Sequence, residues 1–242
     1  MIRQITIFLV VLITACKQNS PSVDKVSVED SSTSIDSLQN FSITNATAED
    51  FSKANKAYKD KTLFDTTTFN KANGEIKLPI KEGWKSFVIF RDTLLNTDDT
   101  EIREYKYLGQ FDKIGFYIVS GLFWEHYECY LIDKTNGRQT TLWNNPILSP
   151  HNKFIANLSM PYGLEGTANG VQIWRVYRQD NNELEPVISK YLELDQQIWA
   201  PDDFVWETDY SLLLKITAVE NYMNESRQPN QKDFYYIRLR IK

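Results

Sequence analysis

Residues 130–142 read YLIDKTNGRQTTL, and this stretch decides the fold class. Two short runs that suit β-strands, 130–132 and 140–142, flank the dipeptide Asn136-Gly137. Asn-Gly favours the positive φ angles that a tight hairpin turn requires. The stretch therefore predicts a β-hairpin whose two antiparallel strands meet at Asn136-Gly137.

Further strand-like segments lie on both sides of this hairpin. They are rich in β-branched and aromatic residues and are separated by Gly, Pro, Asn and Asp. They cover residues 84–90, 102–108, 115–132, 154–158, 171–177, 212–219 and 234–241. Residues 180–183 predict a second hairpin turn, between 171–177 and 184–188. Because no helical segments separate these strands, the pattern predicts an all-β fold with antiparallel sheets.

A motif after the first hairpin makes the fold prediction more specific. Residues 149–156, SPHNKFIA, resemble the S-P-D-G-K-x-I-A turn and strand found in the blades of TolB-like and dipeptidyl-peptidase-like β-propellers. A weaker echo follows about fifty residues later, where Trp199-Ala200-Pro201-Asp202-Asp203 precedes the apolar run 212–214. The resemblance implies blade-like antiparallel meanders, in a partial or small β-propeller. A β-sandwich built from such meanders is the alternative.

The N-terminus has the features of an export signal. Arg3 is followed by an apolar run over residues 5–13, which is too short to span a bilayer, since a spanning helix needs about twenty apolar residues. The run ends in Leu12-Ile13-Thr14-Ala15-Cys16, which resembles the lipobox of bacterial, Bacteroidetes-type lipoproteins. The resemblance implies cleavage before Cys16 and lipid on that cysteine. We therefore expect a cell-envelope protein anchored to the outer membrane, with the periplasmic face slightly favoured over the cell surface.

The domain organisation follows from this signal and from a change in composition. Residues 1–15 are the predicted signal peptide, and 16–46 are the lipidated cysteine and a flexible, disordered linker rich in polar residues. Residues 47–242 are the predicted single β-rich domain. Its first element is a short helix near 48–60, since Thr47 is a capping hydroxyl and acidic residues occupy the first turn.

The net charge limits the classes of partner that we expect, and the cysteine content limits the disulfides. The chain has 27 basic and 32 acidic residues, a formal net charge of −5, which argues against nucleic acid and against a polybasic membrane patch. Lipidation of Cys16 would leave only Cys129, so no intramolecular disulfide is expected. Cys129 lies in an apolar, aromatic run and is expected to be a buried, inert thiol.

The strongest candidate for chemistry is the run Glu125-His126-Tyr127-Glu128. On a strand, His126 and Glu128 point to one face and Glu125 to the other, so the pair could supply two metal ligands. No HExxH, HxH or CxxC supplies the third ligand that a catalytic zinc site needs. A surface histidine beside a carboxylate is therefore the favoured interpretation, and we expect no metal and no cofactor.

An acidic cluster is the second candidate. Asp202 and Asp203, with Glu207 and Asp209, could bind calcium or act as the paired carboxylates of a glycosidase. Their spacing matches no calcium loop, which favours a solvated loop. The chain also has no G-x-S-x-G elbow, so the resemblance to propeller blades does not carry over peptidase chemistry.

Two function classes remain from the sequence. The first is a non-catalytic envelope protein that binds another envelope protein or a glycan. The second is a glycan hydrolase that uses carboxylates such as Glu125, Glu128 or Asp202. The missing catalytic signatures favour the first, by analogy with other tethered β domains.

Overall fold

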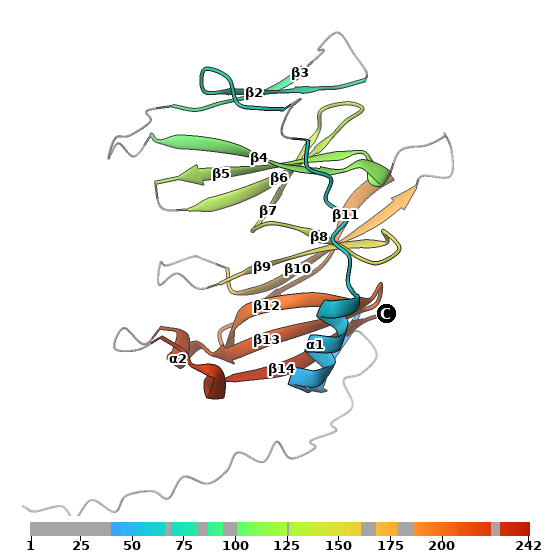
Figure 1. Cartoon of the computed structure of the whole chain (residues 1–242), viewed down its shortest axis with the longest axis vertical. Coiled ribbons are helices and arrows are strands. Elements are labelled where there is room, and N and C mark those ends of the chain that lie inside the picture. The colour runs from blue at the N-terminus through green and yellow to red at the C-terminus, as the bar shows by residue number, and fades with distance from the viewer. Residues whose placement is uncertain are drawn as a thin grey trace, which may run out of the picture. The chain divides into compact units, whose positions relative to one another are not determined.

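The computed structural model describes residues 40–65, 69–81, 87–93, 101–124, 126–160, 168–178, 186–223 and 228–242. Within these ranges the chain forms four antiparallel sheets and two helices (Figure 1). The predicted all-β fold of meander sheets is therefore confirmed. The signal peptide, Cys16 and most of the linker lie outside the described residues, so those predictions stay untested.

The strands follow one another along the chain in three of the four sheets. The first two are β2 (Glu75–Pro79) with β3 (Phe87–Arg91), and β4 (Arg103–Phe111), β5 (Phe116–Phe123), β6 (Tyr127–Asp133) and β7 (Gln139–Leu142). The third holds β8 (Ile147–Leu148), β9 (Phe154–Ser159), β10 (Gly170–Arg178) and β11 (Pro186–Asp195). The fourth has the order β1-β14-β13-β12, with β1 at Phe41–Ala46, β12 at Trp199–Thr208, β13 at Ser211–Ala218 and β14 at Phe234–Ile241.

The helical elements are short and lie around these sheets. Helix α1 spans Ala48–Ala57 and helix α2 spans Val219–Tyr222. Two 3₁₀ turns, Asp112–Ile114 and Gln231–Asp233, precede β5 and β14. The predicted helix start is present: the Thr47 hydroxyl accepts a hydrogen bond from the Asp50 N–H at 3.1 Å, and Asp50 accepts one from the Thr47 N–H at 3.0 Å.

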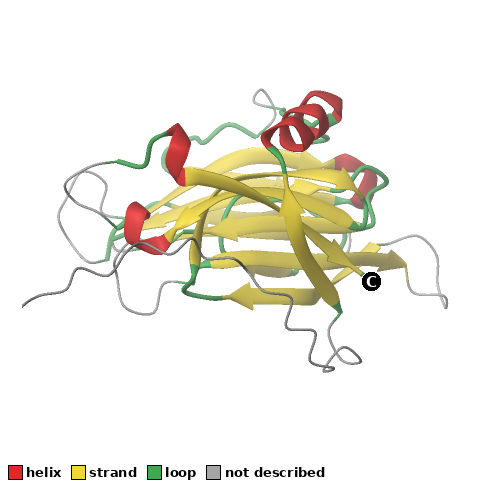
Figure 2. Cartoon of the chain, turned by 90° about the horizontal axis from the view of Figure 1, so that it is seen from below, coloured by secondary structure: helices red, strands yellow, loops and turns green. Residues whose placement is uncertain are grey.

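The core consists of separate apolar layers between successive sheets. Alternate residues of a strand face opposite sides, so the β4–β7 and β8–β11 sheets bury both of their faces. One layer joins the β8–β11 sheet to the β12–β14 sheet around Trp206 and Phe154. A second joins it to the β4–β7 sheet around Phe111 and Ile118, and a third joins that sheet to β2–β3 around Leu78. The sheets are therefore stacked in four layers (Figure 1), where a β-sandwich has two, and Figure 2 views the stack from the end at which the β12–β14 sheet lies.

The hairpin that decided the prediction is present. β6 pairs with β7 in antiparallel register, with Ile132 opposite Gln139. Gly137 has a φ of +75°, whereas Asn136 is not among the residues with positive φ, so the turn places only its glycine in the left-handed region. β10 and β11 are paired as predicted, although the turn at 180–183 lies outside the described residues.

Two expectations for local structure were wrong. The predicted linker extends too far, because Phe41–Ala46 form strand β1, which pairs with β14 from Phe41 opposite Ile241 to Ala46 opposite Tyr236. Residues 199–203, the weaker repeat of the blade motif, do not form the turn that the resemblance implies. They begin strand β12, where Pro201 pairs with Ile216 and Asp202 is the extra residue of a β-bulge. Proline is tolerated there because β12 is an edge strand.

Candidate functional site

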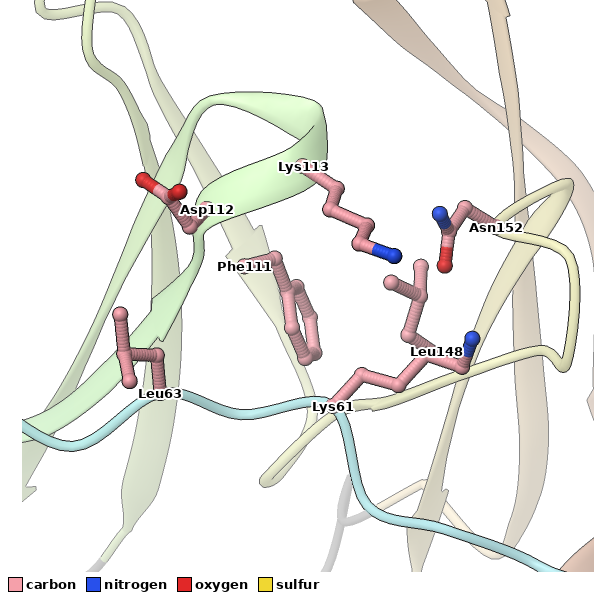
Figure 3. A pocket seen from close by; sticks show the side chains of 7 residues that line it. All are labelled: Lys61, Leu63, Phe111, Asp112, Lys113, Leu148 and Asn152. Carbon is pink, nitrogen blue, oxygen red and sulfur yellow. The ribbon is translucent and has the colours of Figure 1, made fainter.

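One pocket lined by described residues lies where the chain crosses from α1 to the β2–β3 sheet. Residues 58–63, here called the strap, run across the edge strands β8 and β4 of two neighbouring sheets. The pocket has a volume of about 250 Å³. It is lined by Lys61, Leu63, Phe111, Asp112, Lys113, Leu148 and Asn152 (Figure 3).

Backbone and side-chain hydrogen bonds hold the strap in place. Leu63 and Gln110 exchange two backbone hydrogen bonds, each 2.9 Å long, so the strap adds a short antiparallel bridge to β4. At the other sheet, the Tyr58 hydroxyl donates to the Leu148 carbonyl at 2.9 Å and the Lys61 ammonium donates to the Pro150 carbonyl at 2.5 Å. The strap wall of the pocket is thus fixed to both sheets.

The turn after β8 supplies the opposite wall, and it uses the motif that resembles propeller blades. The Ser149 hydroxyl accepts hydrogen bonds from the Lys153 and Phe154 N–H groups, both at 3.0 Å. Asn152 has a φ of +63°, a conformation in which asparagine is among the best tolerated residues after glycine. Asn152 therefore takes the place that glycine has in the blade motif, and its side chain lines the pocket.

A buried carboxylate fixes this turn to the last sheet. Asp209 accepts a hydrogen bond from the His151 N–H at 2.7 Å and contacts the His151 ring Nδ1 at 2.9 Å. Burial by itself raises the pKa of Asp209, but these contacts and a hydrogen bond from Ser149 outweigh it and hold the pKa below its usual value. His151 thus lies in the predicted turn, where it orients the segment that carries Asn152.

The pocket carries a positive charge at one end. Lys61 and Lys113 extend from opposite walls toward Asn152, whereas Asp112 lies at the far end (Figure 3). The Lys134 ammonium lies 2.9 Å from the Asp112 carboxylate, and this contact holds the Asp112 pKa below its usual value. Because the Lys134 ammonium neutralises the Asp112 carboxylate, Asp112 does not neutralise the positive charges of Lys61 and Lys113.

Two polar groups at the positive end have unused hydrogen-bonding capacity. The Asn152 side-chain oxygen is buried and has no hydrogen-bond partner among the described residues. An unsatisfied buried polar atom costs about 1–3 kcal/mol, so such an atom calls for an explanation. Lys113 is exposed and forms no ion pair or hydrogen bond within the described ranges. This end of the pocket can therefore both donate and accept hydrogen bonds.

The first predicted candidate, residues 125–128, lies outside this pocket. Glu125 lies outside the described residues. His126 and Glu128 do come together, with 3.7 Å between Nε2 and Oε1, and the His126 ring stacks on Phe123 at 4.3 Å between centroids. The Tyr130 hydroxyl donates a hydrogen bond to Glu128. Within the described part of the chain, no group of three His, Cys, Asp or Glu side chains could hold a metal ion.

The acidic cluster does not converge on one point. Asp202 is paired with the Lys215 ammonium at 2.6 Å, while Asp203 accepts a hydrogen bond from the Phe204 N–H. Burial raises the pKa of Asp203. Glu207 forms a two-point ion pair with Arg238, at 2.8 and 3.0 Å. These carboxylates lie on strand β12, so the expectation of a loop was wrong, and each has a partner of its own.

The residues that form the pocket were not identified from the sequence. Lys61, Lys113 and Asn152 come from three segments that only the fold brings together. One signal was present: Asn152 departs from the glycine of the blade motif, which placed a polar side chain on a turn. For the lysines, no spacing or periodicity marked them out from the other basic residues.

No helix in the described residues is long and apolar enough to cross a membrane. A scan against protein-family models, a search of curated proteins and a search of solved structures each found no match for this chain.

Proposed function

We propose that this protein is a non-catalytic binding module of the bacterial cell envelope, and that it binds a small anionic ligand in the pocket beneath the strap. The lipobox-like residues 12–16 support an envelope location, with lipid on Cys16 and the periplasmic face of the outer membrane favoured. A partner is thus expected in the envelope, either a free small molecule or the end of a glycan.

The observation that carries the proposal is the pair of lysines at one end of the pocket. Lys61 and Lys113 face the same small volume without an opposing carboxylate between them (Figure 3). Ammonium groups that share a partly enclosed site attract an anion, because their interaction with it is stronger there than in bulk water. The strap fixes Lys61 in advance, which lowers the entropy that binding must overcome.

Catalysis is less well supported than binding. A retaining or inverting glycosidase needs two carboxyl groups about 5–10 Å apart that flank the scissile bond. In the described residues, Asp202 and Glu207 are instead bound to Lys215 and Arg238. The pocket itself contains one carboxylate, Asp112, which Lys134 neutralises.

Anion titration of the full-length protein in a non-ionic detergent tests the binding function. Acetate and inorganic phosphate are added to ¹⁵N-labelled protein, and we expect amide shifts at Leu63, Lys113 and Asn152. Lys61→Met with Lys113→Met should abolish these shifts. Lys106→Met is the matched control, since this exposed lysine lies about 17 Å before Phe111 on the same strand. Neither anion shifting these amides would refute the binding function.

The anchor is tested separately by metabolic labelling with an alkyne palmitate analogue. We expect label on the native protein and none on Cys16→Ala, because that thiol is the predicted site of the lipid. Protease treatment of intact cells then distinguishes the periplasmic face from the cell surface. Native protein without label would refute the anchor and leave the binding function standing.

A further inference from the structure

We infer that the ligand is a small hydroxylated carboxylate of the sugar-acid class, such as a uronate, free or at the end of a glycan. This inference rests on the proposed binding function and adds the chemistry of the ligand. It follows from three features of the pocket: its two ammonium groups, its unpartnered acceptor and its apolar wall.

The ammonium groups define the anionic part. Lys61 already donates one hydrogen bond to the Pro150 carbonyl, so two of its three donors are left. Lys113 is exposed and its ammonium has no hydrogen-bond or ion-pair partner within the described part of the chain, so all three of its donors are available. A carboxylate has two oxygens and accepts up to about four hydrogen bonds, so it can engage both lysines at once.

The side-chain oxygen of Asn152 lacks a hydrogen-bond donor, and we expect the same ligand to supply one. A carboxylate supplies none, since it is an acceptor only. A phosphate monoester loses its last proton with a pKa near 6 and is also mostly an acceptor at neutral pH, so it would face Asn152 with oxygen against oxygen. The ligand must therefore carry a separate hydrogen-bond donor close to its anionic group.

The two lysines also decide what kind of donor this is. An amino group would be protonated at neutral pH, and its charge would be repelled by Lys61 and Lys113. A hydroxyl group donates without carrying charge. The pocket thus favours a hydroxy acid over an amino acid.

Binding and exposure of the acceptor are linked through Lys113. The Asn152 oxygen is covered in the free protein, and Figure 3 shows the Lys113 side chain extending toward this residue. Lys113 is exposed and free to change rotamer. A carboxylate that draws the Lys113 ammonium to itself would move this side chain away from Asn152 and open room for the neighbouring hydroxyl beside the Asn152 oxygen.

The size of the pocket and its apolar wall indicate what the rest of the ligand is like. Drug-sized ligands occupy pockets of about 300–1,000 Å³, so a pocket of about 250 Å³ takes something smaller. Leu63, Phe111 and Leu148 form an apolar surface beside the polar end. The C–H face of a sugar ring can pack against such a surface while its carboxylate and a hydroxyl reach the polar end.

The test compares three probes on the full-length protein in detergent: D-galacturonate, its neutral methyl ester, and acetate. We expect galacturonate to bind at least about tenfold more tightly than either of the others. Asn152→Gly keeps the positive φ and removes the acceptor, so it should weaken galacturonate about three- to tenfold, as one neutral hydrogen bond predicts, and leave acetate unchanged. Lys106→Met is again the control.

The outcomes separate this inference from the proposed function. If acetate binds through Lys61 and Lys113 as tightly as galacturonate does, the pocket is a general anion site and the sugar-acid inference is overturned. Equal binding of the methyl ester would overturn it too, because the carboxylate would then be irrelevant. If the native protein binds none of these anions, both the proposed binding function and the sugar-acid inference are overturned.

Discussion

Replacing Gly109 by alanine should loosen the strap. Gly109 lies at a β-bulge of strand β4 and has a φ of +132°, a region that is nearly restricted to glycine. An added Cβ would lie 2.6 Å from the Thr62 side-chain methyl carbon and 3.0 Å from the Leu63 carbonyl oxygen. Because both atoms belong to the strap, the variant must either move the strap or distort β4.

The expected size of the effect follows from these contacts. The unfavourable φ costs about 1–3 kcal/mol, and each backbone hydrogen bond lost between Leu63 and Gln110 costs about 0.5–1.5 kcal/mol. Gly109→Ala should therefore lower the free energy of unfolding by roughly 2–6 kcal/mol. Gly115→Ala is the matched control. Gly115 has a φ of +69°, but nothing lies within 4 Å of the added Cβ. Gly115→Ala should therefore lower the free energy of unfolding by only about 1–2 kcal/mol.

Urea unfolding of the full-length protein measures both values, and amide hydrogen exchange at Leu63 and Gln110 reports on the strap. We expect exchange at both amides to accelerate in Gly109→Ala and to stay unchanged in Gly115→Ala under native conditions. Equal destabilisation by the two substitutions, with both amides still protected, would refute the idea that the strap depends on close approach at Gly109.

Three further predictions concern stability and reactivity. Thr47→Ala removes the N-cap of α1 and should lower the free energy of unfolding by about 1 kcal/mol, measured by urea unfolding against Thr44→Ala on the exposed face of β1. The lowered pKa of Asp209 means that its charge stabilises the fold above the unfolded-state pKa of about 3.9, an effect lost as the pH falls through the lower folded-state pKa. Asp209→Asn should thus lower the free energy of unfolding at pH 7, and the difference from the native protein should shrink as the pH falls through the folded-state pKa of Asp209; a difference that does not change with pH would contradict this. Burial raises the pKa of Cys129 to about 12, so a thiol reagent at pH 8 should label it only after denaturation, and rapid labelling of the folded protein would show that it is not buried.

The sequence predicted the local β structure well because the signal there is local. Asn136-Gly137 and the β-branched runs determine their hairpins without help from distant residues. Strand β1 has no such signal: of its six residues only Phe41 and Ile43 are large and apolar, and Ile43 is exposed. It is a strand because β14, about two hundred residues away, offers an edge to pair with.

The pocket could not be predicted for a related reason. Its charge comes from Lys61 on the strap and from Lys113 in a 3₁₀ turn. In the sequence, neither lysine differs from an ordinary lysine that is exposed to solvent. Their convergence depends on the order in which the sheets stack and on the path of the strap across two of them. Residue spacing carries no information about either. The predicted candidates His126 and Glu128 were close in sequence, which is why sequence reasoning could find that pair.

The two end faces of this stack of sheets differ in what covers them. At one end, Phe51 and Ala54 of helix α1 cover Val205 and Leu213 on the outer face of the β12–β14 sheet. At the other end, the outer face of β2–β3 carries the ion pairs of Glu75 with Lys77 and Arg91, and it also exposes Phe87 and Ile89.

The free edge of β2 is protected as well. Ala72 and Glu75 satisfy each other's backbone groups, and Pro79 offers no N–H. Such features discourage pairing with another strand. Among the described residues, the pocket under the strap combines a buried, unpartnered side-chain oxygen, that of Asn152, with two lysines that no carboxylate in the pocket neutralises, and this is why we assign binding to it.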